Sequence, residues 1–288
     1  MKKKKILFLS LVLGIAVMLM LTACNKEESV DSNKLKVAVT IEVEKDFVEG
    51  VAGDLVDVVT LVPKGGSPET YEASPLETSK FQAADIFFAM ELPVENGKNI
   101  PKGGKFITVN LADAVRDKYE ERYFAPGSRD HHIWLSPKRV IVMVEKIAAT
   151  LIEKDPLNKD VYMKNKEEYI KKLEKLDLDI QEMFKDKSQK TFLIYHPALG
   201  YFADEYGLEM LAFEEEGKEA EPKHIGELID IAKAKNIKGI ITTEEISSKQ
   251  VDAFAEEIGG KVIVVEVLAK DYIGSMENMA KKIEGLLR

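Results

Sequence analysis

The sequence has 288 residues, which is enough for one large or two medium domains, and its 45% hydrophobic content is ordinary for a globular protein. Its formal net charge is -9, and it falls to -13 when residues 1–23, with four lysines and no acidic residue, are set aside. Such an acidic chain excludes nucleic acid as an expected partner, because DNA binding relies on clustered basic side chains that neutralise phosphates.

The N-terminal segment has the parts of an export signal. Lysines fill residues 2–5, residues 6–20 are apolar, and small residues precede Cys24, the only cysteine. This pattern resembles a bacterial lipoprotein signal, so we expect removal of residues 1–23 and lipidation of Cys24. An uncleaved anchor is the alternative, but the apolar stretch is short for a bilayer-spanning helix. A lipidated Cys24 leaves no thiolate, so any metal site must use nitrogen and oxygen.

Residues 24–34 are polar and predict a flexible tether. From residue 35 onward, short β-branched runs alternate with helical patterns, which indicates an α/β layer with a mostly parallel sheet. We assign residues 35–155 to this first lobe. Its expected strands are 35–41, 56–62, 86–90 and 106–109, and its expected helices are 46–53, 76–84 and 138–154.

Residues 156–189 predict one long helix, because apolar side chains recur at three- and four-residue steps with no glycine or proline after Pro156. A helix lying on one domain is the alternative, but its place midway along the chain favours a rigid connector. A second lobe, residues 190–288, repeats the alternation of strands and helices. The predicted fold class is therefore α/β, with two similar, mostly parallel lobes joined by one long helix and a ligand site in the cleft between them.

Residues 130–137, Asp-His-His-Ile-Trp-Leu-Ser-Pro, hold two of the four histidines and the only tryptophan. They end in Ser136-Pro137, a signal for the start of a helix. Imidazole is a common metal ligand and a common general base, so this stretch supports either kind of site. A surface histidine pair beside a packed tryptophan is the alternative interpretation.

Polar side chains follow the ends of several predicted strands, where open parallel sheets bind their ligands. Glu69 lies in the glycine- and proline-rich loop 63–75, His132 precedes the last helix of the first lobe, and His196 and Glu266 each directly follow a strand. Singly, each carboxylate could be a solvated or capping group, and His196 could be a core histidine. Together, two imidazoles and two carboxylates predict a site for zinc, manganese or ferrous iron.

These motifs resemble those of the metal-binding lipoproteins of bacterial zinc and manganese ABC transporters, the TroA-like or cluster A-I solute-binding proteins. The resemblance runs from residue 35 to the C-terminus and is carried by residues 62–72, 130–137, 196–203 and 266–272. It implies that His132 and His196 are the second and third ligands, that the two lobes move little, and that a membrane permease is the partner. The chain departs from the family at Glu69, where histidine is usual, and at Glu266-Val267, where aspartate-proline is usual.

The resemblance and the residues together predict an extracytoplasmic receptor, anchored to the membrane by lipid on Cys24, that captures zinc or manganese and delivers it to an ABC permease. We expect a monomer with no organic cofactor and no enzymatic activity. If Glu69 does not reach the metal, water or Glu244 would complete the site. We expect His132 to face the cleft and His131 the solvent. The alternatives are a surface adhesin or organic-solute receptor that has lost metal binding, and a metal-dependent hydrolase.

Overall fold

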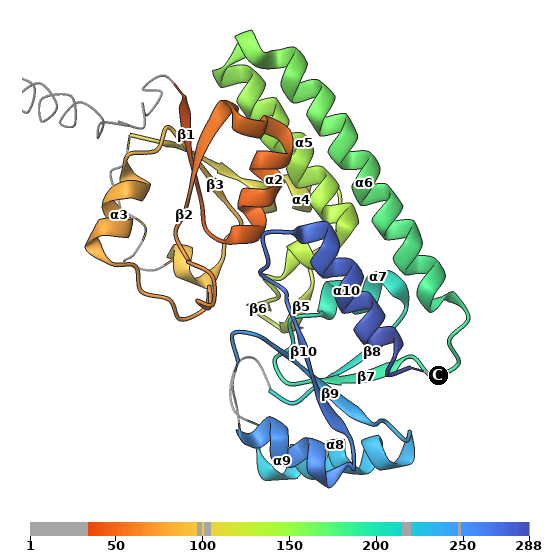
Figure 1. Ribbon diagram of the computed structural model, residues 1–288. Coiled ribbons are helices and arrows are strands. Elements are labelled where there is room, and N and C mark those ends of the chain that lie inside the picture. Colours follow the sequence, from red (N-terminus) through yellow and green to blue (C-terminus); the bar gives the residue numbers. More distant parts are fainter. Residues whose placement is uncertain (1–33, 97–99, 101–104, 215–219, 247–248, 288) are drawn as a thin grey trace, which may run out of the picture. The chain divides into compact units, whose positions relative to one another are not determined.

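Two parallel four-stranded sheets form the framework of the computed structural model, which describes residues 34–96, 100, 105–214, 220–246 and 249–287. The expected signal segment, Cys24 and nearly all of the expected tether lie outside these residues. Leu35–Arg288 forms one compact unit, so both sheets belong to the same body (Figure 1). Among the described residues, no helix is both long and apolar enough to cross a membrane.

The first sheet has the strand order β2-β1-β3-β4, and the second has the order β10-β9-β7-β8. In each lobe the strands therefore lie in the order second, first, third, fourth along the sheet, which confirms the prediction of two similar parallel α/β lobes. The first sheet consists of β1 (Leu35–Val39), β2 (Val56–Thr60), β3 (Ile86–Ala89) and β4 (Ile107–Asn110). The second consists of β7 (Thr191–Ile194), β8 (Glu209–Ala212), β9 (Gly239–Thr243) and β10 (Lys261–Val265).

The helices of the first lobe begin where the sequence supplies caps. Ser74 and Glu77 exchange backbone and side-chain hydrogen bonds in a capping box, and the Ser136 hydroxyl accepts from the backbone N–H of Arg139; in both cases a proline follows the cap. The helices are α2 (Glu42–Ala52), α3 (Pro75–Gln82), α4 (Leu111–Arg116) and α5 (Pro137–Lys154), with 3-10 turns η1 (Gly53–Leu55), η2 (Pro93–Asn96) and η3 (Ile133–Leu135).

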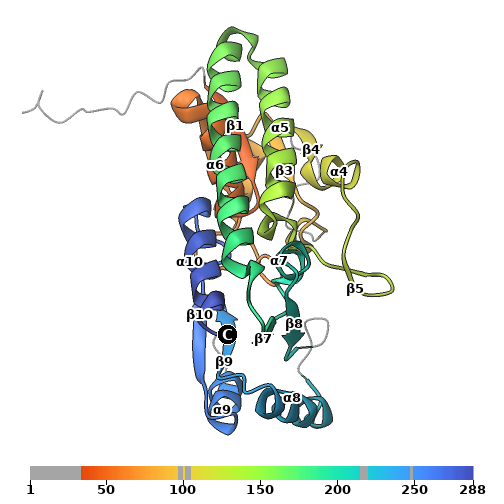
Figure 2. The ribbon, with the colours of Figure 1, turned by 90° about the vertical axis from the view of Figure 1, so that its right-hand side faces the viewer.

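The long helix α6 (Lys159–Lys185) follows the 3-10 turn η4 (Pro156–Asn158) and runs beside α5 from the first lobe to the second (Figures 1 and 2). Its 27 residues span about 40 Å at about 1.5 Å per residue. One apolar stripe faces the core and carries Tyr162, Tyr169, Leu173, Leu176, Ile180 and Phe184. The prediction of a long connecting helix is confirmed.

Strand β7 and Tyr195, the residue after it, show how the second lobe divides its apolar side chains between two cores. Phe192 and Ile194 point into the large core shared with the first lobe, whereas Leu193 and Tyr195 point into a smaller core on the other face. Figure 2 shows α8 and α9 on that far face. The second-lobe helices are α7 (Gly200–Tyr206), α8 (Pro222–Ala234), α9 (Lys249–Glu257) and α10 (Tyr272–Glu284).

The large core ties the lobes together through its buried aromatic side chains. The Tyr272 ring, at the start of α10, packs edge-to-face on Phe47 of α2, with ring centroids 5.1 Å apart. Its hydroxyl donates to the backbone carbonyl of Trp134 (2.8 Å), and the Trp134 indole N–H donates to the backbone carbonyl of Val267 (2.8 Å). The two lobes are therefore joined by packing as well as by α6.

A short antiparallel hairpin, β5 (Tyr123–Ala125) and β6 (Ser128–Arg129), stands between α4 and the histidine motif. Neither the hairpin nor α4 was expected from the sequence, because each is too short to show a clear apolar periodicity. The hairpin leads directly into Asp130 and so sets where the histidine motif begins.

Candidate metal centre

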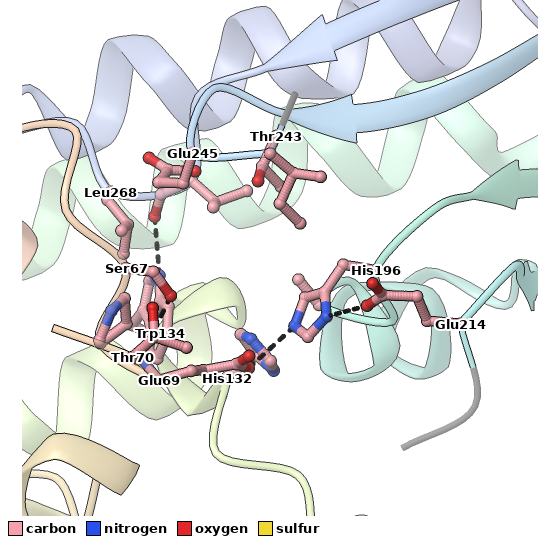
Figure 3. A pocket seen from close by; sticks show the side chains of 14 residues that line it. Ser67, Glu69, Thr70, His132, Trp134, His196, Glu214, Thr243, Glu245 and Leu268 are labelled. Atoms are coloured by element: carbon pink, nitrogen blue, oxygen red, sulfur yellow. Dashed lines mark hydrogen bonds and ion pairs between the residues drawn. The ribbon is translucent and has the colours of Figure 1, made fainter. Parts of the chain in front are cut away.

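A pocket opens between the two lobes at the carboxyl edges of the sheets, and His132 and His196 line it (Figure 3). The first lobe contributes Glu69, His132 and Trp134, and the second contributes His196, Glu214 and Glu245. Because parallel strands end at one edge, the loops after them converge here. The predicted position of the site, in the cleft between the lobes, matches the pocket.

Glu69 is held by the turn that precedes it. The Ser67 hydroxyl accepts from the Glu69 backbone N–H (3.2 Å), and the Ser67 carbonyl accepts from the N–H of Tyr71 (2.9 Å). The next carbonyl, that of Pro68, accepts from Val94 of η2 (3.0 Å). These bonds fix the loop, while the Glu69 side chain remains 38% exposed at the mouth of the pocket.

His132 is oriented by the residue two positions before it. One carboxylate oxygen of Asp130, which is fully buried, lies 2.9 Å from the His132 Nδ1 and 3.0 Å from its backbone nitrogen. The His132 side chain is 9% exposed, and its ring lies against the Trp134 ring. With Nδ1 engaged by Asp130, Nε2 is the nitrogen left to bind a metal ion, as in many histidine ligands.

His196 lies between two carboxylates, as Figure 3 shows. Its Nδ1 is 2.9 Å from Glu214, and its Nε2 is 3.0 Å from Glu69 of the other lobe. Burial opposes the charged imidazole, but the hydrogen bonds to Glu214 and Glu69 outweigh it and raise the pKa of His196 to about 9. The hydrogen bond to His196 lowers the pKa of Glu69. Without a metal, a charged pair thus joins the lobes.

Three donors come together at this point: Glu69, His132 and His196 each offer a ligand atom, and these atoms lie within 4.8 Å of one another. The two imidazole rings are 5.3 Å apart between centroids. Two nitrogens and one carboxylate oxygen form a ligand set typical of zinc, with a fourth position open to water or another group.

The other predicted carboxylates lie outside this cluster. Glu266 follows β10 and is half-buried, but it is not among the residues that line the pocket. The register of β9 and β10 pairs Thr243 with Val265, so Glu244 and Glu266 leave the same sheet edge; Glu244 is exposed and does not line the pocket either. Glu245, the next residue, does line it.

Two residues that support the histidines were not identified from the sequence. Asp130 was part of the motif, but only its buried contact with Nδ1 reveals its role. Glu214 is the first residue of an acidic run, Glu214-Glu215-Glu216. The signal that could have identified it is its place two residues after β8, at the same sheet edge as His196, since the Glu214 backbone N–H donates to the carbonyl of Tyr195 (2.8 Å).

His131 is half-buried instead of facing solvent as expected. Its Nδ1 is inaccessible and has no hydrogen-bond partner among the described residues, and burial lowers the pKa of its imidazole. The ring turns toward the backbone of Glu91, not toward the pocket. Of the histidine pair, only His132 contributes to the site.

The arrangement of two lobes on a long helix, with a His-His-Glu cluster in the cleft, defines a metal-binding solute-binding protein. A profile of the family described as zinc-uptake complex component A periplasmic (ZnuA) matches residues 37–285, and the chain belongs to this family. The expected resemblance is confirmed.

Relatives with known names support this assignment. The chain is 32% identical over 274 residues to the high-affinity zinc uptake system protein ZnuA of Bacillus subtilis (strain 168), a match that covers 88% of this chain and 86% of that protein. It is 27% identical over 271 residues to the manganese ABC transporter substrate-binding lipoprotein PsaA of Streptococcus anginosus, covering 88% and 84%. A crystal structure of ZnuA superposes with a TM-score of 0.83 at 29% identity, covering 88% of this chain and 99% of that one.

Proposed function

We propose that this protein captures a divalent transition metal outside the cytoplasm and delivers it to an ABC permease for import. The observation that carries the proposal is the meeting of Glu69 and His132 of one lobe with His196 of the other, within 4.8 Å. Because the ligands come from both lobes, the ion would lie in the cleft that opens to solvent. A receptor that must release its metal to a partner needs such an accessible site.

Zinc is the proposed cargo. Two carboxylates would favour a harder ion such as manganese, but of the carboxylates that line the described pocket only Glu69 belongs to the cluster of donor atoms within 4.8 Å of one another. Two imidazoles, one carboxylate and a water in the fourth position suit tetrahedral zinc. Glu266 as a fourth ligand remains a prediction from the sequence, and Glu266→Ala tests it: a loss of zinc affinity would support the prediction, and unchanged affinity would contradict it.

The remaining parts of the proposal concern partners and location. We propose that Cys24 carries a lipid, that the partner is a membrane permease, and that the receptor works as a monomer without enzymatic activity. Residues 35–155 and 190–288 would be its lobes and 156–189 their connector. The relative named as an ABC transporter lipoprotein supports the lipid and the permease partner. The absence of enzymatic activity is supported by the hydrogen bonds of Asp130 and Glu214 to the two imidazoles, which leave neither carboxylate free to act as a general base.

Elemental analysis of protein purified without chelators, followed by competition titration of zinc against manganese, tests the proposal. We expect one zinc per chain and tighter binding of zinc. His224→Ala is the matched control, because His224 lies on α8 and contacts the Ala212 carbonyl instead of the pocket. Tighter manganese binding would overturn the choice of metal. A metal-free protein that binds a host surface or an organic solute would overturn the function, as would metal-dependent hydrolysis.

A further inference from the structure

Arg122, just before β5, makes contacts on both sides of the cleft. Its Nη1 lies 3.2 Å from the Asp130 carboxylate in the first lobe, and its Nε lies 3.0 Å from the Asp204 carboxylate on α7 of the second lobe. The side chain is 25% exposed, whereas Asp130 is fully buried. One guanidinium therefore holds two carboxylates from different lobes.

On the first-lobe side, Arg122 contacts Asp130, the residue that orients the proposed ligand His132. The Asp130 carboxylate that it contacts also holds the Nδ1 and the backbone nitrogen of His132. The Arg122 carbonyl accepts from the Asp130 backbone N–H (2.9 Å), which closes the base of the hairpin. A displacement of Arg122 is therefore transmitted to the His132 imidazole through one rigid, buried carboxylate.

On the second-lobe side, Arg122 lies against the start of the helix that follows His196. A Cβ added to Gly200, the first residue of α7, would lie 2.4 Å from the Arg122 guanidinium, so only glycine permits this approach. The hydroxyl of Tyr201 accepts from the Arg122 backbone N–H (2.9 Å) and lies 3.2 Å from the Asp130 carbonyl. Only three residues separate His196 from Gly200, so the same contacts fix the loop that carries His196.

We propose that Arg122 is a positioning residue for metal binding: it sets the separation of His132 and His196 by clamping Asp130 to α7. The inference rests on the proposed function, because it concerns the same metal site. Stability alone does not explain the clamp, since Asp204 is 65% exposed and an exposed ion pair contributes little to folding. The contact with Asp204 adds a fixed distance between Asp130, which holds His132, and α7, which follows the loop that carries His196.

Two kinds of variant loosen the clamp without touching a ligand. Asp204→Asn removes the charge at the second lobe and leaves Asp130 paired. Gly200→Ala leaves every charge in place and displaces the guanidinium. Gly226→Ala is the matched control, because Gly226 also lies in a helix and a Cβ there would meet no atom within 4 Å. Arg122→Gln removes the clamp entirely, and Arg122→Lys restores the charge without the two-pronged geometry.

The experiment uses the full chain, with Zn²⁺ affinity from competition titration and the visible spectrum of bound Co²⁺ as a report of ligand geometry. We expect Gly200→Ala and Arg122→Gln to weaken Zn²⁺ binding by about 10- to 100-fold, as loss of a ligand's support does, and to change the Co²⁺ spectrum. Arg122→Lys should recover part of the affinity, Asp204→Asn should show a smaller loss, and Gly226→Ala should match the native chain.

Wild-type affinity and an unchanged Co²⁺ spectrum in folded Gly200→Ala and Asp204→Asn would overturn the positioning role. If Arg122→Gln does not fold, these two variants decide the question, because Asp204 is on the surface. Failure of the proposed function is a separate outcome: the native chain itself would then bind neither Zn²⁺ nor Co²⁺.

Discussion

Zinc binding should release a proton from His196 at and above neutral pH. In the metal-free protein, Glu214 and Glu69 stabilise the imidazolium against the opposing effect of burial, and the pKa of His196 is about 9. A metal ion binds only the neutral ring, so zinc must displace that proton. Metal binding and proton release are therefore coupled at pH values below about 9.

The size of the coupling follows from the pKa. At pH 7 the ring is two units below its midpoint, so proton competition weakens zinc binding by about 100-fold, or about 2.7 kcal/mol, relative to pH above 9. The logarithm of the affinity should rise by about one per pH unit between pH 7 and 8.5. An ordinary histidine, with a pKa near 6.5, would give a nearly flat profile over the same interval.

Nuclear magnetic resonance of the metal-free chain measures the His196 midpoint directly, through the pH dependence of its ring proton shifts. Calorimetric zinc titrations at pH 8, in two buffers with different ionisation enthalpies, count the released protons. Glu214→Gln is the matched variant: it retains all three proposed ligands but removes one carboxylate, so the midpoint and the proton count should both fall. A native midpoint near 6.5 would refute the reasoning.

Three further outcomes are expected. His132→Ala should weaken zinc binding by roughly 100-fold or more in competition titrations, because it removes a ligand instead of a ligand's support, whereas His131→Ala should retain affinity. In thermal unfolding, the metal-free protein should lose stability as the pH rises from about 6.5 to about 9, because folding raises the pKa of His196 to about 9. The charged His196 stabilises the folded state fully below its unfolded pKa of about 6.5, and this stabilisation is lost above its folded pKa. Tyr272→Phe should lower the free energy of unfolding in urea by about 1 to 2 kcal/mol, because it leaves the buried Trp134 carbonyl without its donor.

Each of these predictions has its own control and contrary result. A His132→Ala chain with nearly native affinity would remove His132 from the ligand set. For the pH series, the zinc-saturated protein should not lose stability between pH 6.5 and about 9, since its His196 ring is already neutral. A loss of stability as large as in the metal-free protein would show that groups other than His196 cause it. For Tyr272→Phe, the control is Tyr123→Phe, whose side chain is 50% exposed, and equal losses in both would show that the buried hydrogen bond contributes nothing specific.

The sequence predicted the parts of the fold that depend on local pattern. The alternation of β-branched runs and amphipathic segments identified both parallel sheets, and the apolar stripe of α6 identified the long helix. The hairpin β5–β6 escaped because its strands are too short for a period of two to show. Strand order within each sheet also lay beyond local pattern, since it depends on which distant segments pair.

The site was predictable where a strand end and a distinctive residue coincide. His196 met both conditions, His132 lay in a distinctive motif before a helix, and the structure brings donor atoms of both within 4.8 Å of Glu69; that the three bind a metal remains a prediction. Glu266, the residue after β10, does not line the pocket, whereas Val267 and Leu268 do, so its role as a ligand remains a prediction. The roles of Asp130 and Glu214 could not be read from the sequence, because each depends on a single hydrogen bond to an imidazole Nδ1.

The position of Tyr272 bears on how the receptor is made. This residue starts α10, yet it donates its hydrogen bond to Trp134, 138 positions earlier, and packs on Phe47 in the first lobe. The first lobe is synthesised long before this contact can form, so the wall of the cleft beside His132 is completed only when α10 packs against it. Such distant pairing slows folding, and it makes the cleft one of the last parts of the molecule to form.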